Sequence, residues 1–136
     1  MDDLKVSHLE MIQAVINRLA NNSFVLKSWN ITVVAGLFAL SAKDANQRYV
    51  FIALLPALSF WGLDAYYLRQ ERLFRALHKF VASANTDSTS EFAMDTVVVQ
   101  KHAQSWFRTL WAGTLFWLHG PIVIVIVVVL INGIQK

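Results

Sequence analysis

Two ionisable residues lie inside apolar stretches of the sequence, and they are the residues best suited to chemistry there. Asp64 lies in "FWGLDAYYL" (60–68), and His119 lies in "LFWLHGPIVIVIV" (115–127). An ionisable side chain costs roughly 3 kcal/mol or more at the centre of a bilayer, so its presence marks a candidate site. We expect Asp64 about one turn inside one membrane boundary, and His119 near mid-bilayer.

Asp64 has candidate partners at a matching depth. Lys27 and Asn30 of a first span, and Arg108 of a third span, enter from the same side as Asp64. One interpretation is a hydrogen-bonded cluster that ties the spans together. A second is an ion-binding or gating role, with Asp64 repeated as a ring in an oligomer. A third is an acid exposed at the membrane interface.

His119 has two interpretations. It is a functional candidate as an intramembrane titratable group. Alternatively, it is a neutral imidazole bonded to a backbone carbonyl that Pro121 frees by kinking the helix. Its expected depth makes Asp64 too shallow to be its partner within one chain.

The sequence contains no pattern typical of metal binding, phosphate binding or nucleophilic catalysis. His8, His78, His102 and His119 are scattered without the spacing of metal ligands. There is no Gly-rich phosphate loop and no nucleophile beside a base. The sequence therefore predicts neither an enzyme nor a cofactor or metal site.

A basic segment follows the stretch around Asp64. Arg69, Arg72, Arg75 and Lys79 recur at helical spacing in "LRQERLFRALHKF" (68–80). They can hold the helix at anionic lipid headgroups, or they can dock a cytosolic protein partner. Basic residues are not interleaved with aromatics in a tract, so nucleic acid is not expected as a partner.

The elements that must position these residues are apolar helices. The chain has 136 residues, 56% of them hydrophobic, and its apolar residues come in long blocks. This predicts an all-α integral membrane protein that forms a single membrane domain, with spans at about 24–42, 49–68 and 110–131. An amphipathic helix is predicted over 7–20, with "NNS" at 21–23 as a break. The second span is predicted to continue as one helix to about Ser83, within a cytoplasmic segment over 69–108.

Positive charge sets the predicted orientation. Nine of the 12 lysines and arginines lie in the N-terminal segment or in residues 69–108. The side richer in Lys and Arg is the cytoplasm, so the N-terminus is predicted to be cytoplasmic and the C-terminus periplasmic. Three spans are too few to enclose an aqueous path, so a pore requires several copies.

Three stretches carry a resemblance. They are "LDAYYLRQERLFR" (63–75), "MIQAVINRLANNSFVLKSWNITVVAGLFALSAKDA" (11–45) and "EFAMDT" (91–96). Together they resemble a widespread group of small bacterial inner-membrane proteins, and the resemblance implies a role in phage defence. The predicted function is a homo-oligomeric membrane effector or ion-conducting assembly. The alternative is a membrane anchor or scaffold that recruits a soluble partner through its cytoplasmic helix.

Overall fold

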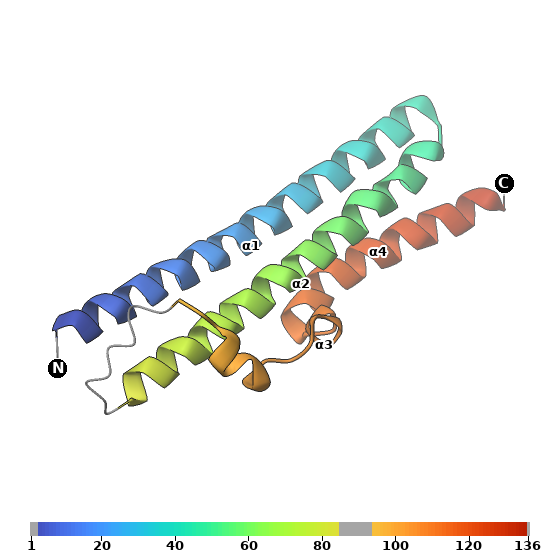
Figure 1. Ribbon diagram of the computed structural model, residues 1–136. Helices are drawn as coiled ribbons and strands as arrows, with labels where there is room; N and C mark the ends of the chain where they lie inside the picture. The colour runs from blue at the N-terminus through green and yellow to red at the C-terminus, as the bar shows by residue number, and fades with distance from the viewer. Residues whose placement is uncertain (1–2, 85–93, 136) are drawn as a thin grey trace.

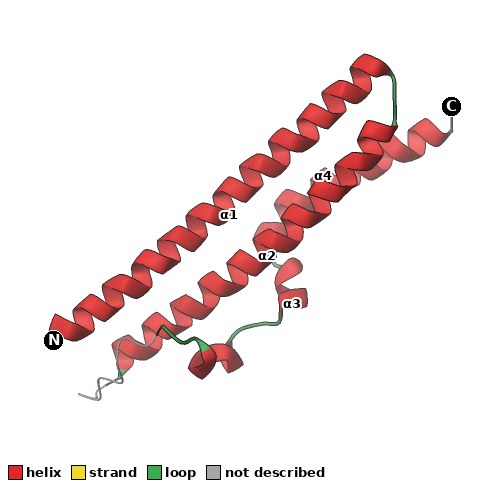
Figure 2. Cartoon of the chain, turned by 45° about the horizontal axis from the view of Figure 1, so that its top comes forward, coloured by secondary structure: helices red, strands yellow, loops and turns green. Residues whose placement is uncertain are grey.

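The fold is built from long antiparallel helices. The computed structural model describes residues 3–84 and 94–135. In chain order it contains α1 (Asp3–Asp44), α2 (Arg48–Ser83), the 3-10 helix η1 (Val97–His102), α3 (Trp106–Leu110) and α4 (Gly113–Ile134). Helices α1 and α2 run side by side, and α4 lies along the first half of α2 (Figures 1 and 2). The described residues contain no strand, and α1, α2 and α4 are long and apolar enough to span a membrane. The predicted all-α class is confirmed for them.

Helix α1 is longer than the sequence suggests. It runs without interruption from Asp3 to Asp44, so the predicted break at 21–23 is wrong, and the predicted helix over 7–20 and span over 24–42 are one element. Asparagine and serine cost only about 0.5 kcal/mol each inside a helix. Packing along α2 outweighs that cost, because Ile12 and Ile16 before the "NNS" and Val34 after it are all buried.

Helix α2 confirms the prediction of a single continuous helix. It extends from Arg48 to Ser83 through Pro56, and it has no turn between Leu68 and Phe74. The third apolar helix begins later than predicted, at Gly113 rather than at residue 110. The short helix α3 precedes it, with Ser105 as its N-cap. A turn at Trp111 and Ala112 therefore separates α3 from α4.

The apolar residues form two separate clusters. The stalk cluster consists of Ile12, Ile16, Leu73, Leu77 and Val99, and joins the start of α1, the end of α2 and η1. The span cluster consists of Val34, Val50, Ala53, Ala57 and Ile126, and joins α1, α2 and α4. Between them lie the buried polar residues Ser23, Asn30, Asp64 and His119. The fold thus places a polar layer between two apolar ones.

Candidate functional site

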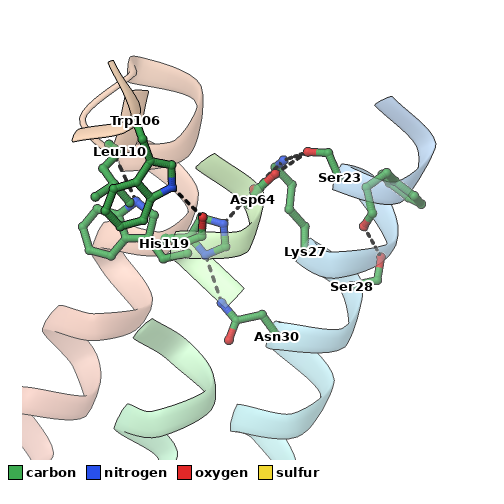
Figure 3. A network of polar contacts seen from close by, with 11 residues as sticks. Ser23, Lys27, Ser28, Asn30, Asp64, Trp106, Leu110 and His119 are labelled. Atoms are coloured by element: carbon green, nitrogen blue, oxygen red, sulfur yellow. Dashed lines mark hydrogen bonds and ion pairs between the residues drawn. The ribbon is translucent and has the colours of Figure 1, made fainter. Parts of the chain in front are cut away.

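Five residues form a polar cluster between α1, α2 and α4: Ser23, Lys27, Asn30, Asp64 and His119 (Figure 3). Asp64 is at its centre. Its Oδ1 accepts a hydrogen bond from Ser23, and its Oδ2 accepts from Lys27 Nζ at 2.6 Å and from His119 Nε2 at 2.8 Å. The side chains of Asp64 and His119 are 0% exposed. One carboxylate therefore joins all three long helices.

His119 is bonded through both ring nitrogens. Asn30 Nδ2 donates to Nδ1 at 3.0 Å, which leaves the ring proton on Nε2, where it is donated to Asp64. The imidazole is then the neutral tautomer. The other end of the Asn30 amide differs, since its Oδ1 is buried and has no hydrogen-bond partner among the described residues. An unpaired buried acceptor is uncommon and calls for an explanation.

The charged groups of the polar cluster are the Lys27 ammonium and the Asp64 carboxylate, which form an ion pair. Lys27 Nζ also donates to Ser23 Oγ at 2.6 Å, so the lysine and the serine hold Asp64 together. The side chain of Lys27 is 26% exposed, whereas that of Asp64 is fully buried. Lysine can extend its ammonium along an apolar surface toward water. Of the two cationic or potentially cationic partners of Asp64, only Lys27 therefore reaches the surface.

Tryptophans enclose the polar cluster on the α4 side. The Trp61 ring is stacked near the His119 ring, with centroids 6.2 Å apart and planes 12° apart. Trp61 Nε1 donates to the Leu110 carbonyl at 3.0 Å, and Trp106 Nε1 donates to the Gly62 carbonyl at 3.1 Å. Both bonds join α2 to α3, the short helix that directly precedes α4 and His119.

The structure separates the predicted partners of Asp64. Lys27 contacts it directly, Asn30 reaches it only through His119, and Arg108 is exposed. Among the described residues, Arg108 forms no ion pair with Asp64. The reason is that Arg108 belongs to the separate helix α3, before the chain turns into α4.

The expectation that Asp64 is too shallow to meet His119 is wrong. The helix α4 starts three residues later than predicted, so His119 lies only about 9 Å beyond its first residue. The alternative that a carbonyl freed by Pro121 binds the ring is also wrong, because side chains occupy both ring nitrogens.

Two members of the site were missed from the sequence. Ser23 was assigned to a helix break, and Trp61 was not singled out. Positions 23, 27, 30 and 34 fall on one face of a helix, so a continuous α1 would have aligned Ser23 with Lys27 and Asn30. Trp61 offers a weaker signal, since it lies about one turn before Asp64.

The basic residues of α2 lie away from the polar cluster. Arg69 Nε donates to the Gln104 carbonyl at 3.2 Å, and Arg75 is paired with Glu71 at 2.7 Å. Arg72, Arg75 and Lys79 line a groove of about 550 Å³ together with Phe80, Val99 and His102. This basic groove is formed by α2 and η1, at the end of the molecule that holds the stalk cluster.

No known protein indicates a role for the polar cluster or the basic groove. Comparison with protein-family models, with curated proteins and with solved structures found no match for this chain. The resemblance noted above stays a prediction. The residues described hold no group of three or more His, Cys, Asp or Glu side chains that could bind a metal ion. What the cluster offers chemically is an ion pair between Asp64 and Lys27, extended by the buried imidazole of His119.

Proposed function

We propose that this chain is a bacterial inner-membrane protein that assembles as a homo-oligomer and conducts ions or perturbs the membrane. The N-terminus is cytoplasmic and the C-terminus periplasmic. Phage defence is the setting suggested by the resemblance alone. The observation that carries the proposal is a line of small, exposed residues on the outward face of α1.

This outward face consists of Ser28, Thr32 and Gly36, which are exposed one turn apart on α1. The hydroxyls of Ser28 and Thr32 donate to backbone carbonyls one turn earlier, at 3.1 and 2.9 Å. A Cβ added at Gly36 would meet nothing within 4 Å. Small residues at this spacing let helices of different copies approach closely in a membrane.

The depth of the bundle fits a bilayer. At ~1.5 Å per residue, Asp64 lies about 24 Å along α2 from Arg48, somewhat less than a hydrocarbon core of about 30 Å. Three of the five tryptophans, Trp29, Trp61 and Trp117, lie within three residues of Lys27, Asp64 or His119. Tryptophan is enriched at membrane interfaces, so the polar cluster would lie near the cytoplasmic one.

Beyond that interface, the end of the molecule that holds the stalk cluster would lie in water with apolar residues on its surface. Leu4, Met11, Phe80, Val97 and Val98 are all exposed there. Exposed apolar groups of this kind favour coverage by another protein surface, and in a homo-oligomer that surface is a neighbouring copy.

Single-cysteine cross-linking tests the assembly. The sequence has no cysteine, so an introduced thiol gives an unambiguous signal. Thr32→Cys should form disulfide-linked dimers in oxidised membrane vesicles, whereas Leu55→Cys, 73% exposed on α2, is the matched control and should stay monomeric. Equal cross-linking of both variants, or a monomeric mass in lipid nanodiscs, would refute the proposal.

The basic groove favours a second candidate function, a membrane anchor for a soluble partner. Arg72 and Lys79 form no ion pair among the described residues, and Phe80 and Val99 add apolar contact. An acidic amphipathic segment fits such a groove. Purified protein in liposomes separates the two functions, since an intact oligomer that passes no ions would favour the anchor.

A further inference from the structure

The polar cluster holds two candidate counter-ions for one carboxylate oxygen. Lys27 Nζ and His119 Nε2 both donate to Asp64 Oδ2, at 2.6 and 2.8 Å. Lys27 belongs to α1 and His119 to α4, so the two bonds tie α2 to different neighbours. With Lys27 charged and His119 neutral, the cluster carries no net charge.

The polar cluster also contains an unused hydrogen-bond acceptor, the Asn30 Oδ1 atom. Asn30 is fully buried, its Nδ2 donates to His119 Nδ1 at 3.0 Å, and its Oδ1 has no partner among the described residues. Rotation of the amide by half a turn brings Oδ1 to His119 Nδ1. An oxygen there can bind only a protonated Nδ1, since an amide oxygen accepts hydrogen bonds and does not donate them.

We infer that the polar cluster is a proton-binding site in which His119 takes up one proton and replaces Lys27 as the counter-ion of Asp64. The proton adds to the Nδ1 lone pair. Asn30 turns, so that Oδ1 accepts the new Nδ1–H while Nε2–H stays on Asp64. Lys27 then moves outward, because a second cation beside one buried carboxylate leaves an uncompensated charge.

The surroundings of His119 suit this exchange. The groups around it are Asp64 on α2, Lys27 and the neutral Asn30 on α1, and the neutral Trp61 ring. The segment before α4 adds Arg108, whose side chain is exposed, and α4 itself carries no other charged residue. Lys27 is 26% exposed, so its ammonium has a route to water. Proton uptake then weakens the tie between α1 and α2 and keeps the tie between α2 and α4.

The first test reads the ring directly. The wild-type protein, labelled with ¹⁵N-histidine in lipid nanodiscs, is titrated by NMR from about pH 8 to about pH 5.5, the range in which histidine ordinarily changes charge. His119 should pass from the Nε2–H tautomer to the imidazolium. His119→Gln serves only to assign the signals, so the titration stands even if that variant folds poorly. A neutral ring throughout, or an infrared band of protonated Asp64 in place of the imidazolium, would overturn the inference.

The second test follows Lys27. Reductive methylation of Lys27 is compared with that of exposed Lys101 in the same sample. Acid lowers the intrinsic reactivity of every lysine, so the ratio of the two rates isolates the release of Lys27. That ratio should rise at least about threefold over the same pH range, because this is the range in which a histidine becomes protonated. A constant ratio would contradict the displacement of Lys27.

The variant Asn30→Leu tests whether Asn30 Oδ1 accepts the proton-bearing Nδ1 of His119. It removes the bond from Nδ2 to the neutral ring as well as the acceptor Oδ1. A hydrogen bond from a charged ring is the stronger of the two, so the imidazolium fraction at about pH 5.5 should fall several-fold relative to wild type. Asn17→Leu is the matched control on the same helix, because exposed Asn17 is bonded to Gln13 at 3.0 Å, away from the polar cluster, and its replacement should leave the titration unchanged. An Asn30→Leu protein that titrates like the wild type would show that the amide has no part in proton binding.

Discussion

The polar cluster and the span cluster join the same three helices in different ways. In the polar cluster, Asp64 accepts directional bonds from α1 and α4. In the span cluster, Ala53 and Ala57 on α2 are 0% exposed and bring α2 close to Val34 and Ile126. Small residues and polar contacts are the means by which helices associate where water is absent. The apolar layer therefore supplies close packing, whereas the polar layer specifies which residues face each other.

The largest expected effect comes from removing the carboxylate. Asp64→Leu leaves Lys27, Ser23 and His119 without their acceptor, and breaking a buried charged pair from one side costs about 3–5 kcal/mol of the free energy of unfolding. Asp64→Asn keeps one acceptor oxygen and should lose less. Unfolding in detergent micelles, followed by circular dichroism, measures both variants.

A double variant checks the cause. Lys27→Met added to Asp64→Leu removes the stranded cation, so the double variant should be more stable than Asp64→Leu alone. Additive losses would mean that the ion pair of 2.6 Å contributes nothing to the joint between α1 and α2.

The second effect probes the span cluster. Ala57→Leu adds volume where α2 packs against α1 and α4, and overpacking a tight core costs about 1–3 kcal/mol. Leu58→Ala is the control at the next position, where the native side chain is half-exposed. It should change the unfolding free energy by less than half as much. A greater loss from Leu58→Ala would show that the outward face, and not the close contact, stabilises this layer.

Much of the fold could be predicted from the sequence, because apolar run length and the absence of breakers determine where such helices form. The continuity of α2 from Arg48 to Ser83 is an example. The continuity of α1 could not be predicted in this way. The local signal at Asn21, Asn22 and Ser23 favours a break, and only the packing against α2 outweighs it.

The site was less accessible to sequence reasoning. Depth matching along straight helices brought Lys27 and Asn30 near Asp64, and in the structure Lys27 contacts it. It failed for His119 and Arg108 because it assumed a third helix that began at residue 110. The chain instead forms α3, turns at Trp111 and starts α4 at Gly113, and only tertiary contacts such as the bond from Trp61 to the Leu110 carbonyl fix that turn.

A third prediction concerns the turn that joins the end of α1 to the start of α2. Ala45 has a positive φ of 48°, and Asn46 N–H donates to the Ser41 carbonyl at 3.3 Å, the pattern of a helix that ends in a left-handed residue. A left-handed conformation costs a residue with a Cβ about 1–2 kcal/mol. Ala45→Gly should therefore raise the unfolding free energy by up to about 1 kcal/mol, part of the gain being offset by the freer unfolded chain. Ala45→Gly is measured by the same detergent unfolding as Asp64→Leu. A lower unfolding free energy for Ala45→Gly would show that the turn gains more from the side chain than from relief of backbone strain.

The smallest expected effect is at the end of α4. A Cβ on Gly133 would lie 1.1 Å from Gln47 Nε2, which on distance alone suggests a severe clash. Gln47, however, is exposed, and the atoms in question are the far end of its flexible side chain, which can rotate into open space. Against that adjustment, alanine gains about 1 kcal/mol over glycine inside a helix, and less in its last turn. Gly133→Ala should thus change the unfolding free energy by no more than about 0.5 kcal/mol, measured by the same detergent unfolding. A loss comparable to that of Ala57→Leu would mean that Gln47 is held rigidly, and that the contact between the turn and α4 belongs to the packed core.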